Sequence, residues 1–252
     1  MLPVRMELIV MRRFTTLGDI LRYLRRTRVG GAVEYAAQFV GGLIRPELLE
    51  SGATPEDERR PLPGDDLVPH PMWEATRAIT IDAPLAEVWP WVAQMGYGRG
   101  GWNPLEREDT GVTQLLPEIQ PPTVGDIWLD GPGCDETKGA FTVKAAEEPR
   151  TLVLHSMRNP LTGRELDPSH KPYLYIDTGW TFHLDRIARH RTRIRVSPRW
   201  AILPLRWIGG GDTVMQRRLL EGIKVRAEAA ASRQLLRIPH TGAGSAEAAS
   251  PS

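Results

Sequence analysis

The residues that could carry acid–base chemistry are few and scattered along the chain. The six histidines lie at positions 70, 155, 170, 183, 190 and 240. None of these positions gives the H-x-x-x-H or H-E-x-x-H spacing of a metal site on a helix. His155, among apolar residues in a predicted strand, is the best single acid or base, with a satisfied core histidine as the alternative. Glu118 and Asp126 could act in the same way if buried beside a ligand, or they are solvated turn carboxylates.

Other kinds of catalytic or cofactor site find little support in the sequence. The single cysteine, Cys134, excludes an intramolecular disulfide and any multi-cysteine metal site. No G-x-S-x-G nucleophile elbow and no P-loop lysine occurs. Gly96, Gly98 and Gly101 fit G-x-G-x-x-G, but a predicted helix precedes them where the dinucleotide fingerprint needs a strand. The glycines therefore predict a tight chain reversal, and we expect neither a metal nor a cofactor.

Composition and charge limit the partners of the chain. Its 252 residues are 41% hydrophobic and 25% charged, with a formal net charge of +1. Such a chain folds, and it has no global field that would attract nucleic acid or acidic substrates. Arg191, Arg193 and Arg195 form a basic ladder, but outward charges on a strand are ordinary solvation without interleaved aromatic residues. We expect no nucleic-acid partner.

The N-terminal part divides sharply by charge. Residues 1–45 hold eight arginines against three acidic residues and read as two short amphipathic helices. Residues 46–72 are acidic and rich in proline, which predicts a linker. The basic helices either pack on the protein or make peripheral contact with an anionic membrane. With no signal-peptide core and no run of roughly 18 apolar residues, the expected compartment is the cytoplasm.

Residues 73–238 carry the pattern of one compact domain, and a small polar tail over 239–252 is predicted to be disordered. Helices are predicted over 85–95 and from an N-cap at Asp212 to 237. Strands are predicted over 76–81, 127–129, 139–146, 151–157, 173–184 and 191–200. The last two strands alternate strongly, with Thr178, Trp180 and Phe182 on one face of the first, and form a hairpin with one apolar face. A sheet with one apolar face and a long amphipathic helix must pack together, which predicts a two-layer α+β domain.

Several short motifs, taken in their order along the chain, resemble those of the START-like superfamily (SRPBCC, polyketide cyclase/dehydrase and lipid-transport proteins), in a poorly characterised bacterial branch. These motifs are Pro63-Gly64-Asp65, Val88-Trp89-Pro90-Trp91, Gln94 to Arg99, Gly101-Trp102, Leu116 to Gln120, Val124-Gly125-Asp126, Thr192-Arg193 and Ile223-Lys224 to Ala227-Glu228. The likeness spans roughly residues 61–232. It implies a helix-grip fold, in which an antiparallel sheet wraps around a long C-terminal helix, here with an N-terminal helical extension. It is weak for activity, because one fold hosts many functions.

The resemblance also implies a ligand cavity between the sheet and the C-terminal helix. The residues expected at the ligand are Gln94, Arg99, Trp102, His155, Met157, Trp180, Phe182, Ile194, Met215, Leu219 and Ile223. For any one of them, the alternative is a filled core or, for Gln94 and Arg99, a structural hydrogen bond. The favoured hypothesis is binding of a small hydrophobic molecule, such as a lipid, polyketide or aromatic metabolite. The alternative is a cyclase or dehydratase that uses Glu118, Asp126 or His155 in the same pocket.

Overall fold

The computed structural model describes residues 52–101, 114–130, 134–159, 161–170, 172, 174–202 and 209–237. The predicted basic helices over 1–45 and the tail over 239–252 lie outside these residues. Of the acidic segment predicted over 46–72, the part from residue 52 onward is described.

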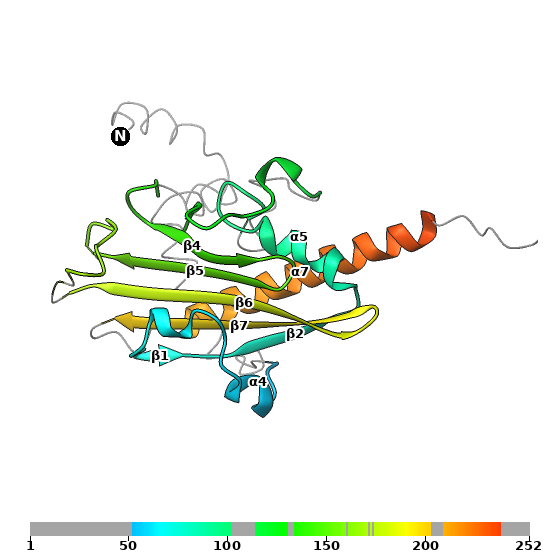
Figure 1. Ribbon diagram of the computed structural model, residues 1–252, viewed down its shortest axis with the longest axis horizontal. Helices are drawn as coiled ribbons and strands as arrows, with labels where there is room; N and C mark the ends of the chain where they lie inside the picture. The colour runs from blue at the N-terminus through cyan, green and yellow to red at the C-terminus, as the bar shows by residue number, and fades with distance from the viewer. Residues whose placement is uncertain are drawn as a thin grey trace, which may run out of the picture.

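The described chain is built around one antiparallel sheet of seven strands (Figure 1). The strands are β1 (Trp73–Glu74), β2 (Arg77–Ile81), β3 (Ile127–Leu129), β4 (Ala140–Glu147), β5 (Thr151–Arg158), β6 (Ile176–Ala188) and β7 (Arg191–Ile202). Their order in the sheet is β1-β7-β6-β5-β4-β3, with β2 also paired to β7. The predicted α+β class and the predicted hairpin are therefore confirmed, and the hairpin is β6 and β7, paired from Ile176↔Ile202 to Ala188↔Arg191.

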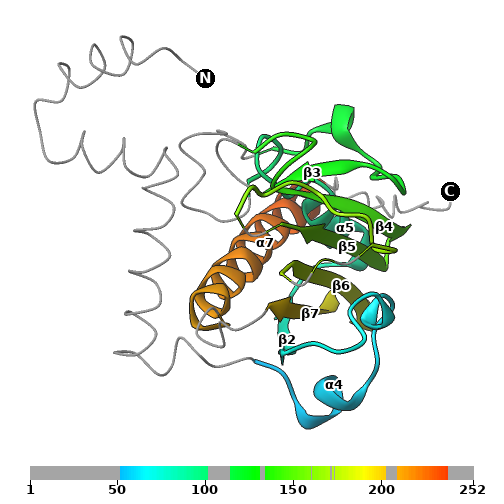
Figure 2. The same ribbon diagram turned by 90° about the vertical axis from the view of Figure 1, so that its left-hand side faces the viewer.

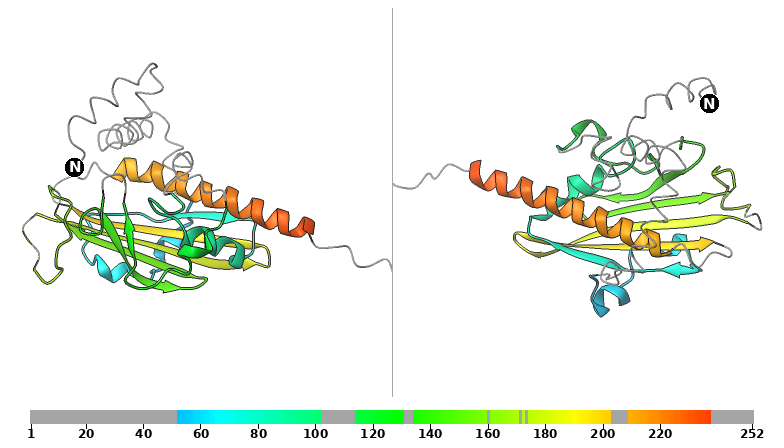
Figure 3. Two further views of the ribbon diagram at one scale, coloured as in Figure 1. Left: turned by 90° about the horizontal axis from the view of Figure 1, so that it is seen from above. Right: turned by 180° about the vertical axis from the view of Figure 1, so that it is seen from behind.

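Two helices cover one face of this sheet, which we call the inner face. They are α5 (Leu85–Ala93) and α7 (Gly209–Arg237), which contact each other and lie over the strands (Figure 2 and Figure 3). Because side chains alternate along a strand, each strand sends every second residue to this face. The inner side chains merge with the buried stripe of α7, including Leu219 and Ile223, into one apolar core.

The boundaries of the helices differ slightly from the predicted ones. α5 ends at Ala93, two residues before the predicted Met95. α7 begins at Gly209, so Asp212 lies inside the helix and is not its N-cap. No helix in the described ranges is long and apolar enough to cross a membrane.

The acidic segment is not an open linker where the structure describes it. Residues 52–74, which we call the outer segment, form α4 (Pro55–Arg59), a 3-10 helix (Asp65–Leu67) and β1. A capping box between Thr54 and Asp57 starts α4, with Pro55 at its first position. The left-hand view of Figure 3 places α4 on the side of the sheet opposite α7. The outer segment thus forms a second cover, over the outer face.

Arg193 and Arg195 of the arginine ladder lie beneath this cover, which corrects the prediction of a solvated face for them, whereas Arg191 is exposed as predicted. Arg193 pairs with Asp57 at 2.6 Å, and the side chain of Arg195 is only 2% exposed. Arg195 pairs with Asp185 of β6 at 3.0 Å. The prediction failed for Arg193 because its partner Asp57 comes from a segment that the sequence does not link to this strand.

Candidate functional site

Aromatic rings form the centre of the inner face. Trp180 of β6 stacks on Phe141 of β4, with ring centroids 5.5 Å apart and planes at 17°. Trp180 also meets Phe182 edge to face at 6.1 Å. Such pairs stabilise beyond the area they bury. Five residues predicted to line the ligand are buried in this one core: Trp180, Phe182, Ile194, Leu219 and Ile223. Ligand contact by these residues stays a prediction.

Polar contacts fix α7 above the apolar core at the edge strand β2. Lys224 donates to the carbonyl oxygen of Thr80 at 2.8 Å and pairs with Glu228 at 2.5 Å. Glu228 also accepts a hydrogen bond from the backbone N–H of Asp82 at 2.8 Å. Burial raises the pKa of Glu228, but these hydrogen bonds outweigh it and lower the pKa overall. Lys224 and Glu228, which belong to the last motif of the resemblance, therefore have a structural role.

The inner face changes from apolar to polar along the same strands while it remains buried. On β5, Leu152 and Leu154 are followed by Ser156 and Arg158, and on β6, Trp180 is preceded by Thr178. Ser156 and Thr178 are direct cross-strand partners and are 3% and 0% exposed. We call Ser156, Thr178 and Arg158 the polar corner.

Arg158 joins the polar corner to the aromatic centre. Its guanidinium carbon lies 5.4 Å from the ring centroid of Phe141, within the range of a cation–π contact. One guanidinium nitrogen of Arg158 lies 2.7 Å from Asp130, whose side chain is 40% exposed. The hydroxyl of Thr178 is buried and has no hydrogen-bond partner among the described residues. A buried unpaired hydroxyl costs about 1–3 kcal/mol, so this corner holds unused hydrogen-bonding capacity.

Sequence reasoning missed this polar corner as a group. Thr178 was predicted to share a face with Trp180 and Phe182, and the register confirms this. Ser156 and Arg158 gave no such signal because all eight residues of β5 are buried, so polarity along the strand does not reveal the side. Of the other predicted ligand contacts, Trp102 lies outside the described residues, and Met215 lies in α7 with its side chain outside them.

His155 and Met157 lie on the outer face and do not join the predicted set. His155 is paired with Gly179, one residue before Trp180, so the two residues point to opposite sides of the sheet. His155 Nε2 lies 2.7 Å from Asp177 Oδ1, and its N–H donates to that carboxylate. This pair is 9% and 3% exposed, which makes His155 a satisfied buried histidine.

The three acid–base candidates are not brought together. Glu118 is exposed in the 3-10 helix Pro117–Ile119. The Asp126 carboxylate accepts hydrogen bonds from the backbone and hydroxyl of Thr123, at 2.9 and 2.7 Å. Burial lowers the pKa of Arg99, and the charge of Asp126 partly opposes this effect. In the described part of the chain, no hydrogen bond or ion pair links Glu118, Asp126 and His155.

Gln94 and Arg99 use their polar groups to hold a loop. Gln94 is 2% exposed, and its side-chain oxygen accepts a hydrogen bond from the N–H of Leu116 at 3.0 Å. Arg99 donates to the carbonyl oxygen of Ile119 at 3.0 Å and lies 4.4 Å above the ring of Trp128. These bonds tie residues 114–120 to the end of α5. They match the structural alternative given above.

The glycine motif after α5 forms a tight chain reversal, as predicted. Gly96, Gly98 and Gly101 have φ angles of +121°, +73° and +80°. Gly101 donates to the carbonyl oxygen of Gly96 at 2.9 Å, which closes the turn. Positive φ angles favour glycine, so the backbone geometry of the reversal accounts for the glycine spacing.

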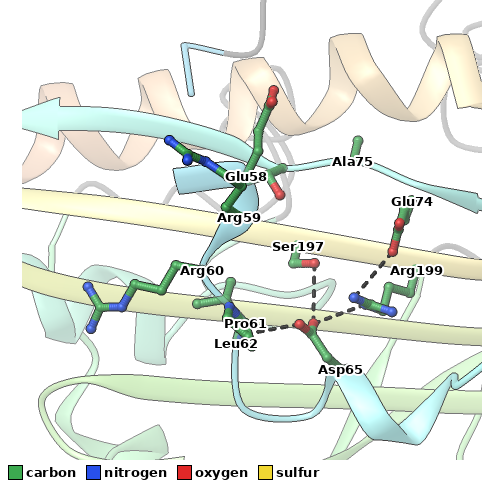
Figure 4. A pocket seen from close by; sticks show the side chains of 11 residues that line it. Glu58, Arg59, Arg60, Pro61, Leu62, Asp65, Glu74, Ala75, Ser197 and Arg199 are labelled. Atoms are coloured by element: carbon green, nitrogen blue, oxygen red, sulfur yellow. Dashed lines mark hydrogen bonds and ion pairs between the residues drawn. The ribbon is translucent and has the colours of Figure 1, made fainter. Parts of the chain in front are cut away.

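A groove of about 510 Å³ opens between the outer segment and β7 (Figure 4). Its centre is Asp65, which accepts hydrogen bonds from Arg199 at 3.0 Å and from Ser197 at 3.5 Å. Arg199 also pairs with Glu74 at 3.2 Å. The charged groups at the centre of the groove pair with each other, so they hold the outer segment against β7.

Comparison with known proteins gives matches to solved structures only. No protein-family model and no curated protein matches the sequence. A protein from Nitrosospira multiformis is 18% identical, with 64% of this chain and 99% of that chain covered and a TM-score of 0.41. One from Mesorhizobium loti is 16% identical over 62% and 98%, with a TM-score of 0.39. The Aha1 dimer from Colwellia psychrerythraea is 14% identical over 62% and 97%, with a TM-score of 0.40. At these scores the matches carry no inference about activity; the fold rests on the strand order and pairing above.

Proposed function

We propose that the protein binds a small hydrophobic molecule between the inner face of the sheet and α7. The observation that carries this proposal is the buried change from apolar to polar side chains on the inner face, from Trp180 to Thr178 and from Leu154 to Ser156. Ligand sites are mostly apolar with a few convergent polar groups, which is the composition found here. The helix-grip fold implied by the sequence resemblance is supported by an antiparallel sheet with a long C-terminal helix packed against it.

The position of α7 supports the same proposal. The backbone of α7 comes close to α5 and β2, while its contacts to the central strands run through side chains such as Leu219 and Ile223. A molecule between α7 and β5 or β6 would therefore displace side chains and not backbone. The enzyme alternative has less support, because His155 lies on the outer face, bonded to Asp177, and Glu118 is exposed in a 3-10 helix.

Native mass spectrometry of the full-length protein, purified from the cells that naturally make it, tests the proposal. We expect a retained apolar small molecule. Leu219→Trp should reduce its occupancy, because a larger side chain fills space beside the core; the residue is 3% exposed. Val225→Trp on the same helix is the matched control, because Val225 is 66% exposed and should leave occupancy unchanged. A protein that carries no small molecule, and that binds no neutral apolar dye such as Nile red, would overturn the proposal.

A further inference from the structure

We propose that the ligand carries a carboxylate, or a similar anionic oxygen group, and that the polar corner of Ser156, Thr178 and Arg158 binds it. This inference rests on the proposed function and names the chemical class of its ligand. It starts from two hydroxyls and one guanidinium that share the inner face at one end of the aromatic centre.

The first step is the geometry of the corner. Ser156 and Thr178 are direct partners on neighbouring strands, which places their Cβ atoms about 4.5–5.5 Å apart. Arg158 is two residues beyond Ser156 on the same face of β5. Two O–H donors and a guanidinium can therefore converge on one oxygen group. A carboxylate has two oxygens with about four acceptor positions, which fits three donors.

The second step is the unused bonding capacity of Thr178. Its side-chain oxygen is buried without a hydrogen-bond partner among the described residues, and the residue is 0% exposed. Burial of an unpaired hydroxyl is unfavourable, so a ligand atom that accepts a hydrogen bond from this hydroxyl recovers free energy that the protein without ligand lacks. An apolar ligand without a polar group would leave this hydroxyl unpaired.

The third step is the charge of the corner. Arg158 is 9% exposed and keeps its charge, because a guanidinium does not deprotonate in proteins. Its ion-pair partner Asp130 occupies one nitrogen at 2.7 Å and lies toward solvent, 40% exposed. A guanidinium has five N–H donors, so further donors remain for a second anion. A cationic ligand would meet Arg158 at close range and would be repelled.

The fourth step is the shape of the apolar part. The guanidinium of Arg158 lies over Phe141, and Phe141 stacks on Trp180, so the polar corner continues directly into an aromatic surface. A flat ring or a short alkyl chain attached to the carboxylate would lie on this surface. The expected ligand is therefore a small aromatic or aliphatic carboxylic acid in its ionised form.

Isothermal titration calorimetry with three matched probes tests the inference on the full-length protein. The probes are naphthoate, naphthylmethanol and naphthylmethylammonium, which share one ring system and differ in the polar group. We expect naphthoate to bind about tenfold or more tightly than naphthylmethanol, because charge-assisted hydrogen bonds contribute more than neutral ones. Naphthylmethylammonium should bind most weakly.

Variants then assign the preference to the corner. Arg158→Gln should reduce the preference for naphthoate over naphthylmethanol to about threefold or less, because it removes the positive charge. Thr178→Val keeps the side-chain shape and should weaken naphthoate binding severalfold. Thr181→Val is the matched control, because Thr181 lies on the same strand but on the outer face, where its hydroxyl donates to the carbonyl oxygen of Pro63 at 2.7 Å. Circular dichroism confirms that each variant is folded.

The outcomes separate the two proposals. If naphthoate and naphthylmethanol bind equally, or the ammonium probe binds most tightly, the inference fails and the proposed function stands. If Arg158→Gln and Thr178→Val leave the preference unchanged, the inference also fails. If none of the probes binds and Nile red does not bind either, the proposed function fails and the inference falls with it.

Discussion

On the inner face of the sheet, Leu154 and Phe182 lie against apolar side chains of α5 and α7. On the outer face, Arg193 and Arg195 lie against carboxylates, with Asp57 supplied by the outer segment and Asp185 by β6. Both faces are covered, so neither is the solvated side that an alternating strand pattern usually indicates. The inner cover is held by burial of apolar surface, and the outer cover is held by paired charges and hydrogen bonds.

The two covers depend on different interactions: apolar burial on the inner face, and specific charged partners on the outer face. Apolar burial is non-directional, and its contribution grows with the area removed from water. The stability of the inner face therefore depends on how well its side chains fill the core. Paired charges depend on a particular partner, salt concentration and protonation state. Mutations on the two faces should therefore differ in size and in their response to solution conditions.

The largest expected effect is on the inner face. Phe182→Ala should lower the free energy of unfolding by about 3–5 kcal/mol, because it removes a 0% exposed ring and leaves a cavity. Urea unfolding followed by far-UV circular dichroism measures this change. Val225→Ala on the exposed side of α7 is the control and should change stability by less than about 0.5 kcal/mol. A loss under 1 kcal/mol for Phe182→Ala would mean that Phe182 does not lie in a close-packed part of the inner face.

A smaller effect tests how tightly the outer segment is packed. Gly64 has a φ of +85°, and a Cβ there would lie 2.5 Å from Val153 Cγ1. Gly64→Ala should therefore cost about 2–3 kcal/mol, from backbone strain and overpacking together. Gly98 has a φ of +73°, and a Cβ there would have no atom within 4 Å, so Gly98→Ala should cost only about 1 kcal/mol, from strain alone.

Thermal unfolding of the two glycine variants measures the difference directly. Equal losses would show that the outer segment moves aside at little cost. The comparison between two buried faces would then fail, because only the inner face would be packed.

The strength of the outer ion pairs is tested by Asp185→Asn. This change removes a carboxylate that lies 3.0 Å from Arg195, whose side chain is 2% exposed. The expected loss is about 2 kcal/mol, as for a hydrogen bond to a charged group. Glu221→Gln is the control, because its pair with Arg217 is more exposed and should contribute under about 0.5 kcal/mol. If both variants lose the same amount, the outer face contributes no more than an ordinary solvated surface.

The inner face was largely predictable from the sequence, and the outer face was not. Alternation over Thr178, Trp180 and Phe182 predicted one apolar face, and the helical stripe of α7 predicted what covers it. The outer cover depends on long-range pairs, such as Asp57 with Arg193, that are 136 residues apart. Local periodicity carries no information about such pairs. The candidate site was found only in part for a related reason, since β5 is buried on both sides and hides which residues join Thr178.

The smallest expected effect is the pH dependence of the outer face. Burial lowers the pKa of His183 below its ordinary value of 6.5, with Asp185 opposing this change and Arg195 and Arg60 adding to it. The unfolded chain therefore binds a proton at this site where the folded chain does not, so stability falls as the pH drops below about 6.5. His183→Gln should flatten this loss between pH 7 and pH 5 by less than about 1 kcal/mol. Asp57 acts in a separate pH range. Burial raises the pKa of Asp57, but hydrogen bonds from Arg193 and Thr54 outweigh this effect and lower the pKa overall. The stability that Asp57 contributes is therefore present at higher pH and is lost as the pH falls below 3.8. Urea midpoints measured at half-unit steps of pH would distinguish the two windows, and a single step near pH 4 without any change near pH 6 would contradict the assignment to His183.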